Sequence, residues 1–162
     1  MVIFAGAPDR RACSLLISQY MDNIFGETAG KILRAVDDNA GWLTSLGGEA
    51  ITQRRNSQGR SVKQILGHLV DSASNNHQRM VRLQYNEELV FPDYTRDNDR
   101  WIAIQDYQNA GWERLVELWR YYNLHLAGIV EVADISCADN YWHDGDGSKV
   151  TLGEMVGSYY SH

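Results

Sequence analysis

The strongest constraint on the fold is the apolar periodicity of residues 61–86. Ser61 followed by Gln64 is a capping-box pattern, in which the Ser hydroxyl accepts a bond from an early backbone N–H and the Gln side chain reaches back. Apolar side chains then recur every three or four residues, which places them on one helix face. They are Val62, Ile65, Leu66, Leu69, Ala73, Met80 and Leu83. The pattern predicts an amphipathic helix of about seven turns that must bury this face.

The N-terminal stretch shows the same spacing less regularly. Apolar residues between positions 15 and 25 have helical spacing, Gly26 and Gly30 loosen the pattern, and it resumes as far as Leu46. We therefore expect a short leading helix, followed by a first bundle helix over residues 28–46.

Two more helices are predicted in the second half of the chain. Apolar and aromatic residues repeat at three- and four-residue spacing from near Tyr107 to about Val132. Thr151 with Glu154 forms a second capping box, so the last helix begins there. With these two, the chain has four main helical segments.

The segments between the helices define the topology. Residues 91–100 contain a proline and many polar side chains, which predicts a long crossover between the second and third helices. Residues 142–150 surround an Asp-Gly-Asp-Gly sequence, which is typical of a small hairpin. We expect an all-α four-helix bundle with an extra N-terminal helix, as one domain over residues 1–162.

Composition narrows the function classes. The formal net charge is −6 and no basic stripe is visible, which argues against binding to nucleic acid. Cys13 and Cys137 lie far apart in the sequence, which fits a reducing compartment. The apolar start is interrupted at residues 9–11 and has no basic segment before it, so neither a signal peptide nor a membrane span is predicted. The expected location is the cytoplasm.

A polar stripe on the second helix is the first candidate site. At 100° per residue, His68, Ser72, Asn75 and Arg79 share one stripe beside the apolar face. Two interpretations of His68 stay open: a core-edge histidine satisfied by one hydrogen bond, which is the commoner environment, or a metal ligand.

His162 favours the interpretation of His68 as a metal ligand. It lies on the predicted last helix, and imidazoles from two helices of a bundle can converge on one metal. His77, His125 and His143 are weaker candidates by position.

The residues above resemble a known family, the DinB-like superfamily of DNA-damage-inducible and YfiT-like metal-binding four-helix proteins. The resemblance is most specific in the run from Ser61 to Ser72 and continues through the residues that follow it on the same helix. Supporting similarity lies in residues 91–94, at Trp101, in residues 112–125 and in residues 151–162.

The resemblance implies a divalent metal held by three histidines. The first matches His68, and the other two form an HxxxH pair on the last helix, whose first member matches His162. The second member would fall four residues beyond the printed sequence. Two explanations stay open: a longer natural chain, or a site in which water, Asp71 or a terminal carboxylate replaces the third histidine.

The resemblance also implies a function. We expect a divalent-metal-dependent enzyme of the thiol S-transferase or hydrolase type, using Zn, Ni, Fe or Mn and a small-molecule substrate such as a low-molecular-weight thiol. Asp71, Ser72, Asn75 and Arg79 would surround the metal or line the substrate pocket. The alternative is a stress-related protein that binds a metal or small molecule without catalysis. Apart from the resemblance, pairing into a homodimer through helix faces is an expectation, because bundles with aromatic surfaces often pair.

Overall fold

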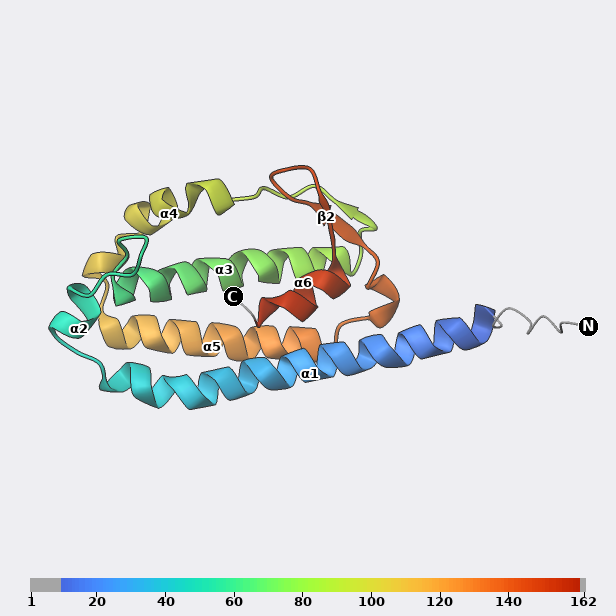
Figure 1. Cartoon of the computed structure of the whole chain (residues 1–162), viewed down its shortest axis with the longest axis horizontal. Helices are drawn as coiled ribbons and strands as arrows, with labels where there is room; N and C mark the ends of the chain where they lie inside the picture. The colour runs from blue at the N-terminus through green and yellow to red at the C-terminus, as the bar shows by residue number, and fades with distance from the viewer. Residues whose placement is uncertain (1–9, 161–162) are drawn as a thin grey trace, which may run out of the picture.

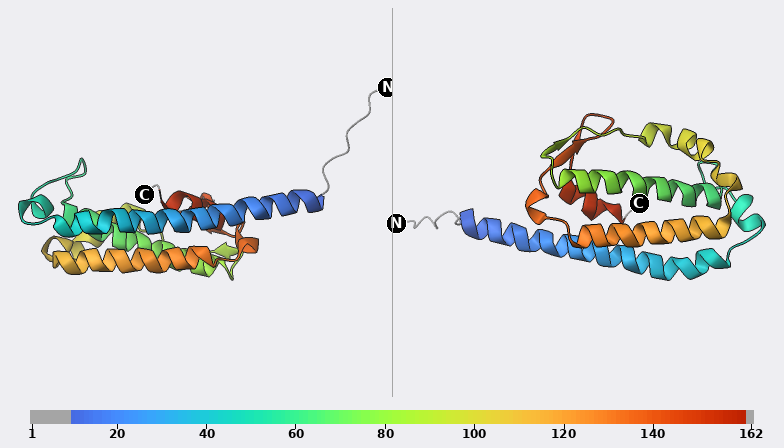
Figure 2. Two further views of the ribbon diagram at one scale, coloured as in Figure 1. Left: turned by 90° about the horizontal axis from the view of Figure 1, so that it is seen from below. Right: turned by 180° about the vertical axis from the view of Figure 1, so that it is seen from behind.

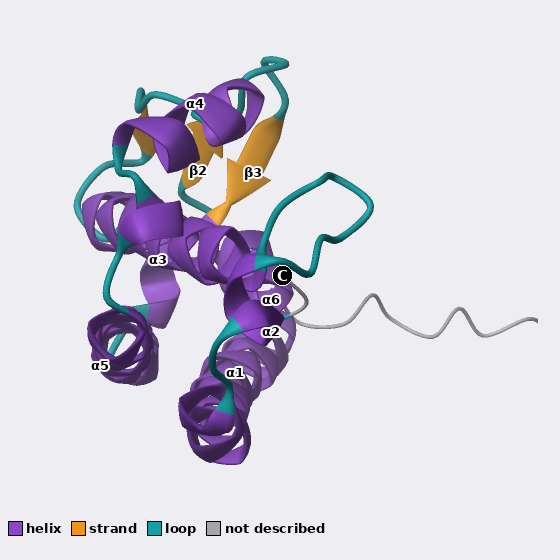
Figure 3. Ribbon diagram, turned by 90° about the vertical axis from the view of Figure 1, so that its left-hand side faces the viewer, coloured by secondary structure: helices purple, strands orange, loops and turns teal. Residues whose placement is uncertain are grey.

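The four main helices form a bundle. The computed structural model describes residues 10–160, with side chains from Ile24 onward. Helix α5 packs against both α1 and α3, and the short α6 also contacts α1 and α3 (Figure 1). Figure 3 shows the helices nearly end on. Their bounds are Arg10–Ser45 for α1, Val62–Leu83 for α3, Trp112–Glu131 for α5 and Leu152–Tyr159 for α6. The all-α four-helix prediction is confirmed.

Helix α1 is continuous over 36 residues and projects beyond the other helices at its N-terminal end (Figure 2). The predicted leading helix is therefore the first part of α1, not a separate element. Gly26 and Gly30 do not interrupt the helix, because a glycine inside a helix costs only about 1 kcal/mol relative to alanine. The side chains of Phe25, Ala29 and Ile32 on the same stretch of α1 are buried, which fixes this part of the helix against the core.

The crossover between α3 and α5 contains more helix than the sequence predicted. Residues 91–100 were expected to be a loop, yet α4 (Asn98–Ile104) begins within them. The third bundle helix begins at Trp112 and not near Tyr107, whose buried ring occupies a 3-10 turn against α3. The remaining short helical elements are α2 (Glu49–Thr52) and the 3-10 turns Thr95–Asp97, Tyr107–Asn109 and Ile135–Cys137.

A small sheet lies beside the end of α3. The predicted hairpin is present as β2 (Tyr141–His143) antiparallel to β3 (Lys149–Thr151). The strand β1 (Glu88–Leu89) pairs in parallel with β2 and was not predicted. This pairing ties the start of the crossover to the hairpin.

Local capping and core burial explain why the helices form where they do. Both predicted capping boxes are present, with Ser61 and Gln64 at the start of α3 and Thr151 and Glu154 at the start of α6. Burying one aliphatic core side chain contributes about 1.5–3 kcal/mol. The most buried are Val36, Met80, Leu83, Leu126, Val130, Leu152 and Val156. Within residues 10–160, no helix combines the length and apolar character needed to cross a membrane.

Candidate functional site

His68 faces a hollow at the side of α3. The hollow has a volume of about 340 Å³. Ile65 and Leu69 of the same helix line it beside His68, which is half-buried. Its other walls come from the loop before α3 and from the start of α4, through Asn56, Gln58, Arg60 and Asn98. The imidazole therefore has a side open to a small molecule.

Tyr94 is the aromatic neighbour of His68. The two ring centroids lie 6.5 Å apart, and the centroid of the Trp101 ring lies 4.9 Å from that of Tyr94. The Tyr94 hydroxyl is hydrogen-bonded to Ser72, and burial raises the pKa of the phenol. Tyr94 therefore keeps its proton at neutral pH and can donate a hydrogen bond.

Asp71 is a buried carboxylate one helical turn after His68. Its Oδ1 accepts hydrogen bonds from Tyr107 Oη and Gln105 Nε2, each at 2.7 Å. Its Oδ2 is also buried and has no hydrogen-bond partner among the described residues. Burial raises the pKa of Asp71, against the opposing effects of the bonds from Gln105 and Tyr107 and of the electrostatic interaction with His68.

The other residues of the polar stripe predicted on α3 lie in different environments. The Ser72 hydroxyl is buried and accepts a bond from Asn76 Nδ2 at 3.3 Å. Ser72 also lines a second hollow, of about 320 Å³, together with Tyr94 and Arg79. Asn75 is buried, and its side-chain amide donates to the backbone carbonyl of Asp71 at 3.0 Å. The Asn75 side chain is thus engaged by its own helix.

Arg79 connects α3 to the crossover and the hairpin. Its guanidinium lies 3.8 Å from the Trp142 ring centroid and 3.5 Å from Asp93 Oδ1, and it donates to the Pro92 carbonyl at 3.2 Å. Burial lowers the pKa of Arg79, and the neighbouring Asp93 opposes that change. These contacts fix the Arg79 side chain in the wall of the second hollow.

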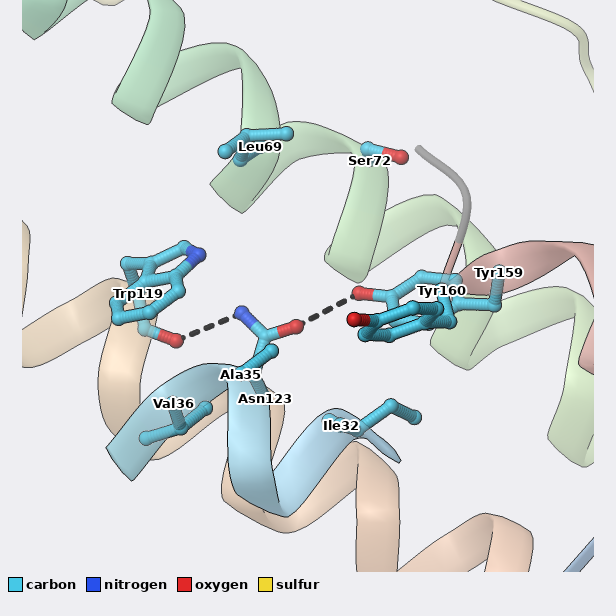
Figure 4. A pocket seen from close by; sticks show the side chains of 9 residues that line it. All are labelled: Ile32, Ala35, Val36, Leu69, Ser72, Trp119, Asn123, Tyr159 and Tyr160. Atoms are coloured by element: carbon cyan, nitrogen blue, oxygen red, sulfur yellow. Dashed lines mark hydrogen bonds between the residues drawn. The ribbon is translucent and has the colours of Figure 1, made fainter. Parts of the chain in front are cut away.

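A third space, a cavity of about 120 Å³, lies among the bundle helices (Figure 4). The Tyr159 hydroxyl donates to Asn123 Oδ1 at 2.9 Å, and Asn123 Nδ2 donates to the Trp119 carbonyl at 2.8 Å. Burial raises the pKa of Tyr159, so its hydroxyl stays neutral. The lining residues are Ile32, Ala35, Val36, Leu69, Ser72, Trp119, Asn123, Tyr159 and Tyr160.

The second predicted metal ligand, His162, lies outside the described residues. Within the described part of the chain, no three His, Cys, Asp or Glu side chains cluster closely enough to hold a metal. A three-ligand site on His68 would therefore need a ligand from outside that part. The remaining histidines have other neighbours: His77 contacts Tyr122 and His125, and His143 contacts Glu88.

Sequence reasoning did not assign the tyrosines that surround the site. Tyr94 and Tyr107 lie in the crossover, where no helical period indicates the direction of a side chain. The sequence Phe91-Pro92-Asp93-Tyr94 was the available signal for Tyr94, because it is part of the DinB-like resemblance. Nothing comparable marked Tyr107.

Comparison with solved structures identifies a protein of similar fold. The chain resembles YfiT from Bacillus subtilis, described as a probable metal-dependent hydrolase with an unusual four-helix bundle topology. The TM-score is 0.64 at 15% sequence identity, and the match covers 99% of this chain and 83% of YfiT. No protein-family model and no curated protein matches the sequence. The chain therefore has the four-helix-bundle fold of YfiT, the fold that the resemblance to DinB-like proteins implied.

Proposed function

We propose that the chain is a divalent-metal-dependent enzyme of the hydrolase or thiol-transferase type, with His68 and His162 as metal ligands. The observation that carries the proposal is the position of His68, which faces a 340 Å³ hollow with the buried carboxylate of Asp71 one turn away. The fold shared with YfiT, a probable metal-dependent hydrolase, supports the same function class.

The donor atoms near His68 fit a transition metal. Imidazole nitrogen is a common ligand for Zn, Ni and Fe, and carboxylate oxygen also suits Mn. Because Tyr107 and Gln105 bind Oδ1 of Asp71, that carboxylate is fixed in place while Oδ2 can accept a further bond. Asp71 would orient a ligand or a water from this position, since such neighbours of metal ligands set their direction.

A bound divalent ion would supply Lewis-acid chemistry, which lowers the pKa of a water or thiol nucleophile toward neutrality. Side chains of the protein itself would bind and orient the substrate. Tyr94, protonated because of its burial, would donate a hydrogen bond to the substrate. Ser72 fixes the Tyr94 hydroxyl, and Arg79 holds the segment that precedes Tyr94 against α3.

A non-catalytic binding protein is the second candidate. It is favoured by the donor count, because no three ligand side chains cluster within residues 24–160. A site with fewer protein ligands would bind metal more weakly. The protein would then bind a small molecule in its hollows without catalysing a reaction. An enzyme converts its substrate and a binding protein does not, so an assay of turnover separates the two candidates.

The test is an assay of metal-stripped protein that has been reloaded with Zn, Ni, Fe or Mn. One series supplies a low-molecular-weight thiol with an electrophile, and a second supplies ester and amide substrates. We expect one metal to restore turnover in one series, His68→Ala to abolish it, and His143→Ala, a histidine of the hairpin, to leave it unchanged. Equal rates for the reloaded wild type and His68→Ala would remove the enzyme proposal.

A further inference from the structure

We propose that the 120 Å³ cavity among α1, α3, α5 and α6 binds the apolar end of the substrate, an uncharged alkyl or aromatic group about as large as a benzene ring. The assignment of this group to a substrate rests on the function proposed for His68. Apart from Ser72, the residues that define the cavity take no part in that function.

The cavity wall is apolar on three helices. Ile32 and Val36 of α1 are 2% and 1% exposed, and Trp119 of α5 is 9% exposed. Ala35 contributes only a methyl group, which leaves room at the α1 side. Figure 4 shows these side chains and Leu69 around the cavity. Such a surface favours an apolar occupant, since burying apolar area is stabilising.

Three polar side chains in the wall, Ser72, Asn123 and Tyr159, already have hydrogen-bond partners. Tyr159 donates to Asn123, and Asn123 donates to the Trp119 backbone (Figure 4). Ser72 is bonded to Tyr94 and Asn76. A buried water typically needs two to four polar partners, and these groups are already engaged. Because these groups are engaged, they offer few further bonds to an ion, and the cavity favours an uncharged ligand.

The volume indicates how much of a ligand fits. An apolar cavity of roughly 150 Å³ binds benzene, whereas whole drug-sized ligands occupy roughly 300–1,000 Å³. At about 120 Å³, the cavity has room for one ring or a short alkyl chain. The rest of such a substrate needs a second space.

The His68 hollow is that second space. Leu69 lines both the cavity and the hollow, and it directly follows His68 on α3. A substrate with its apolar group in the cavity would thus have its polar, reacting end on the His68 side of Leu69. The substrate class is a small molecule with one compact apolar group and one polar reactive group.

The test uses toluene as the probe on the whole chain. Binding is read from the methyl NMR shifts of Ile32, Val36 and Leu69, and from the rise in melting temperature that a ligand of the folded state produces. Ala35→Leu fills the cavity and should weaken toluene binding at least tenfold. Asp37→Leu adds the same side chain at an exposed position of α1 and should leave binding unchanged. His68→Ala should also bind toluene normally.

The outcomes separate the two proposals. No toluene binding by the wild type, or equal binding by Ala35→Leu, overturns the cavity assignment. If Ala35→Leu fails to fold, Val36→Ala tests the cavity instead. This substitution enlarges the cavity, so the variant should bind naphthalene, whereas the wild type should not. If toluene binding follows these expectations while His68→Ala keeps its metal, the metal assignment fails and the apolar site remains.

Discussion

Tyr107 donates a hydrogen bond to Oδ1 of Asp71 over 2.7 Å, linking residues that lie 36 positions apart in the sequence. The bond joins the crossover to α3 one turn from His68. The Tyr107 ring also lies against Gly67, the residue before His68. The surroundings of the candidate metal ligand are therefore set by a tyrosine of the crossover.

Tyr107→Phe should lower the free energy of unfolding by about 1–3 kcal/mol, because a buried carboxylate loses one of its two donors. Urea denaturation measures the change. Tyr85→Phe is the matched control, since Tyr85 is 66% exposed and its substitution should leave stability unchanged. Equal stability of the two variants would mean that the bond to Asp71 contributes nothing.

Gly67→Ala should destabilise the fold by about 1–3 kcal/mol, because a Cβ atom at this position would overlap the Tyr107 ring. Gly26→Ala is the control within α1, where a Cβ would meet no atom within 4 Å. That change should stabilise the protein by about 0.5–1 kcal/mol through helix propensity. Thermal unfolding of both variants shows whether each substitution stabilises or destabilises the protein. A stabilising Gly67→Ala would contradict the close contact between Gly67 and the Tyr107 ring.

Asp71 should make stability depend on pH in metal-free protein. Burial raises its pKa in the folded state above the ordinary value of 3.8, so the folded state binds more protons than the unfolded state between these two values. The stabilising contribution is complete below pH 3.8 and is lost as the pH rises through the folded-state pKa. Asp71→Asn removes the titration, so its stability relative to wild type should increase as the pH rises.

The measurement is urea denaturation of both proteins in EDTA at a series of pH values from 3.5 upward. EDTA keeps metal from adding its own pH dependence. A stability difference that stays constant across the series would show that the carboxyl titrates alike in the folded and unfolded chains.

Arg79→Met should cost about 3 kcal/mol, because it leaves Asp93 without its buried cation and removes the contact with Trp142. Arg96→Met is the matched control, since Arg96 and Asp146 form an exposed pair of the kind that contributes about 0–1 kcal/mol. Chemical denaturation of both variants checks the difference, and similar losses would contradict the role assigned to the buried arginine.

The helical part of the fold could be predicted because its signals are local. A capping box and an apolar stripe occupy consecutive residues, and both lie where the sequence placed them at Ser61 and Thr151. The strand Glu88–Leu89 could not be predicted, because two residues have no period and the strand forms only by pairing with Tyr141 and Trp142. Its existence depends on a contact between distant segments.

The candidate site was predictable only where it lies on a helix. Helical spacing placed His68 and Ser72 on one side of α3, and both line hollows. It could not show that the Asn75 side chain donates to the backbone carbonyl of Asp71, since that depends on the side-chain rotamer. Tyr107 was unpredictable because its direction is set by the turn at the end of the crossover.

The central claim is that His68 is a metal ligand, and elemental analysis of protein purified without a histidine tag tests it most directly. We predict about one divalent ion per chain in the wild type and in His143→Ala, and almost none in His68→Ala, whose helical content should match the wild type. Undiminished metal in His68→Ala, or none in the wild type after incubation with zinc, nickel, iron and manganese, would contradict the claim.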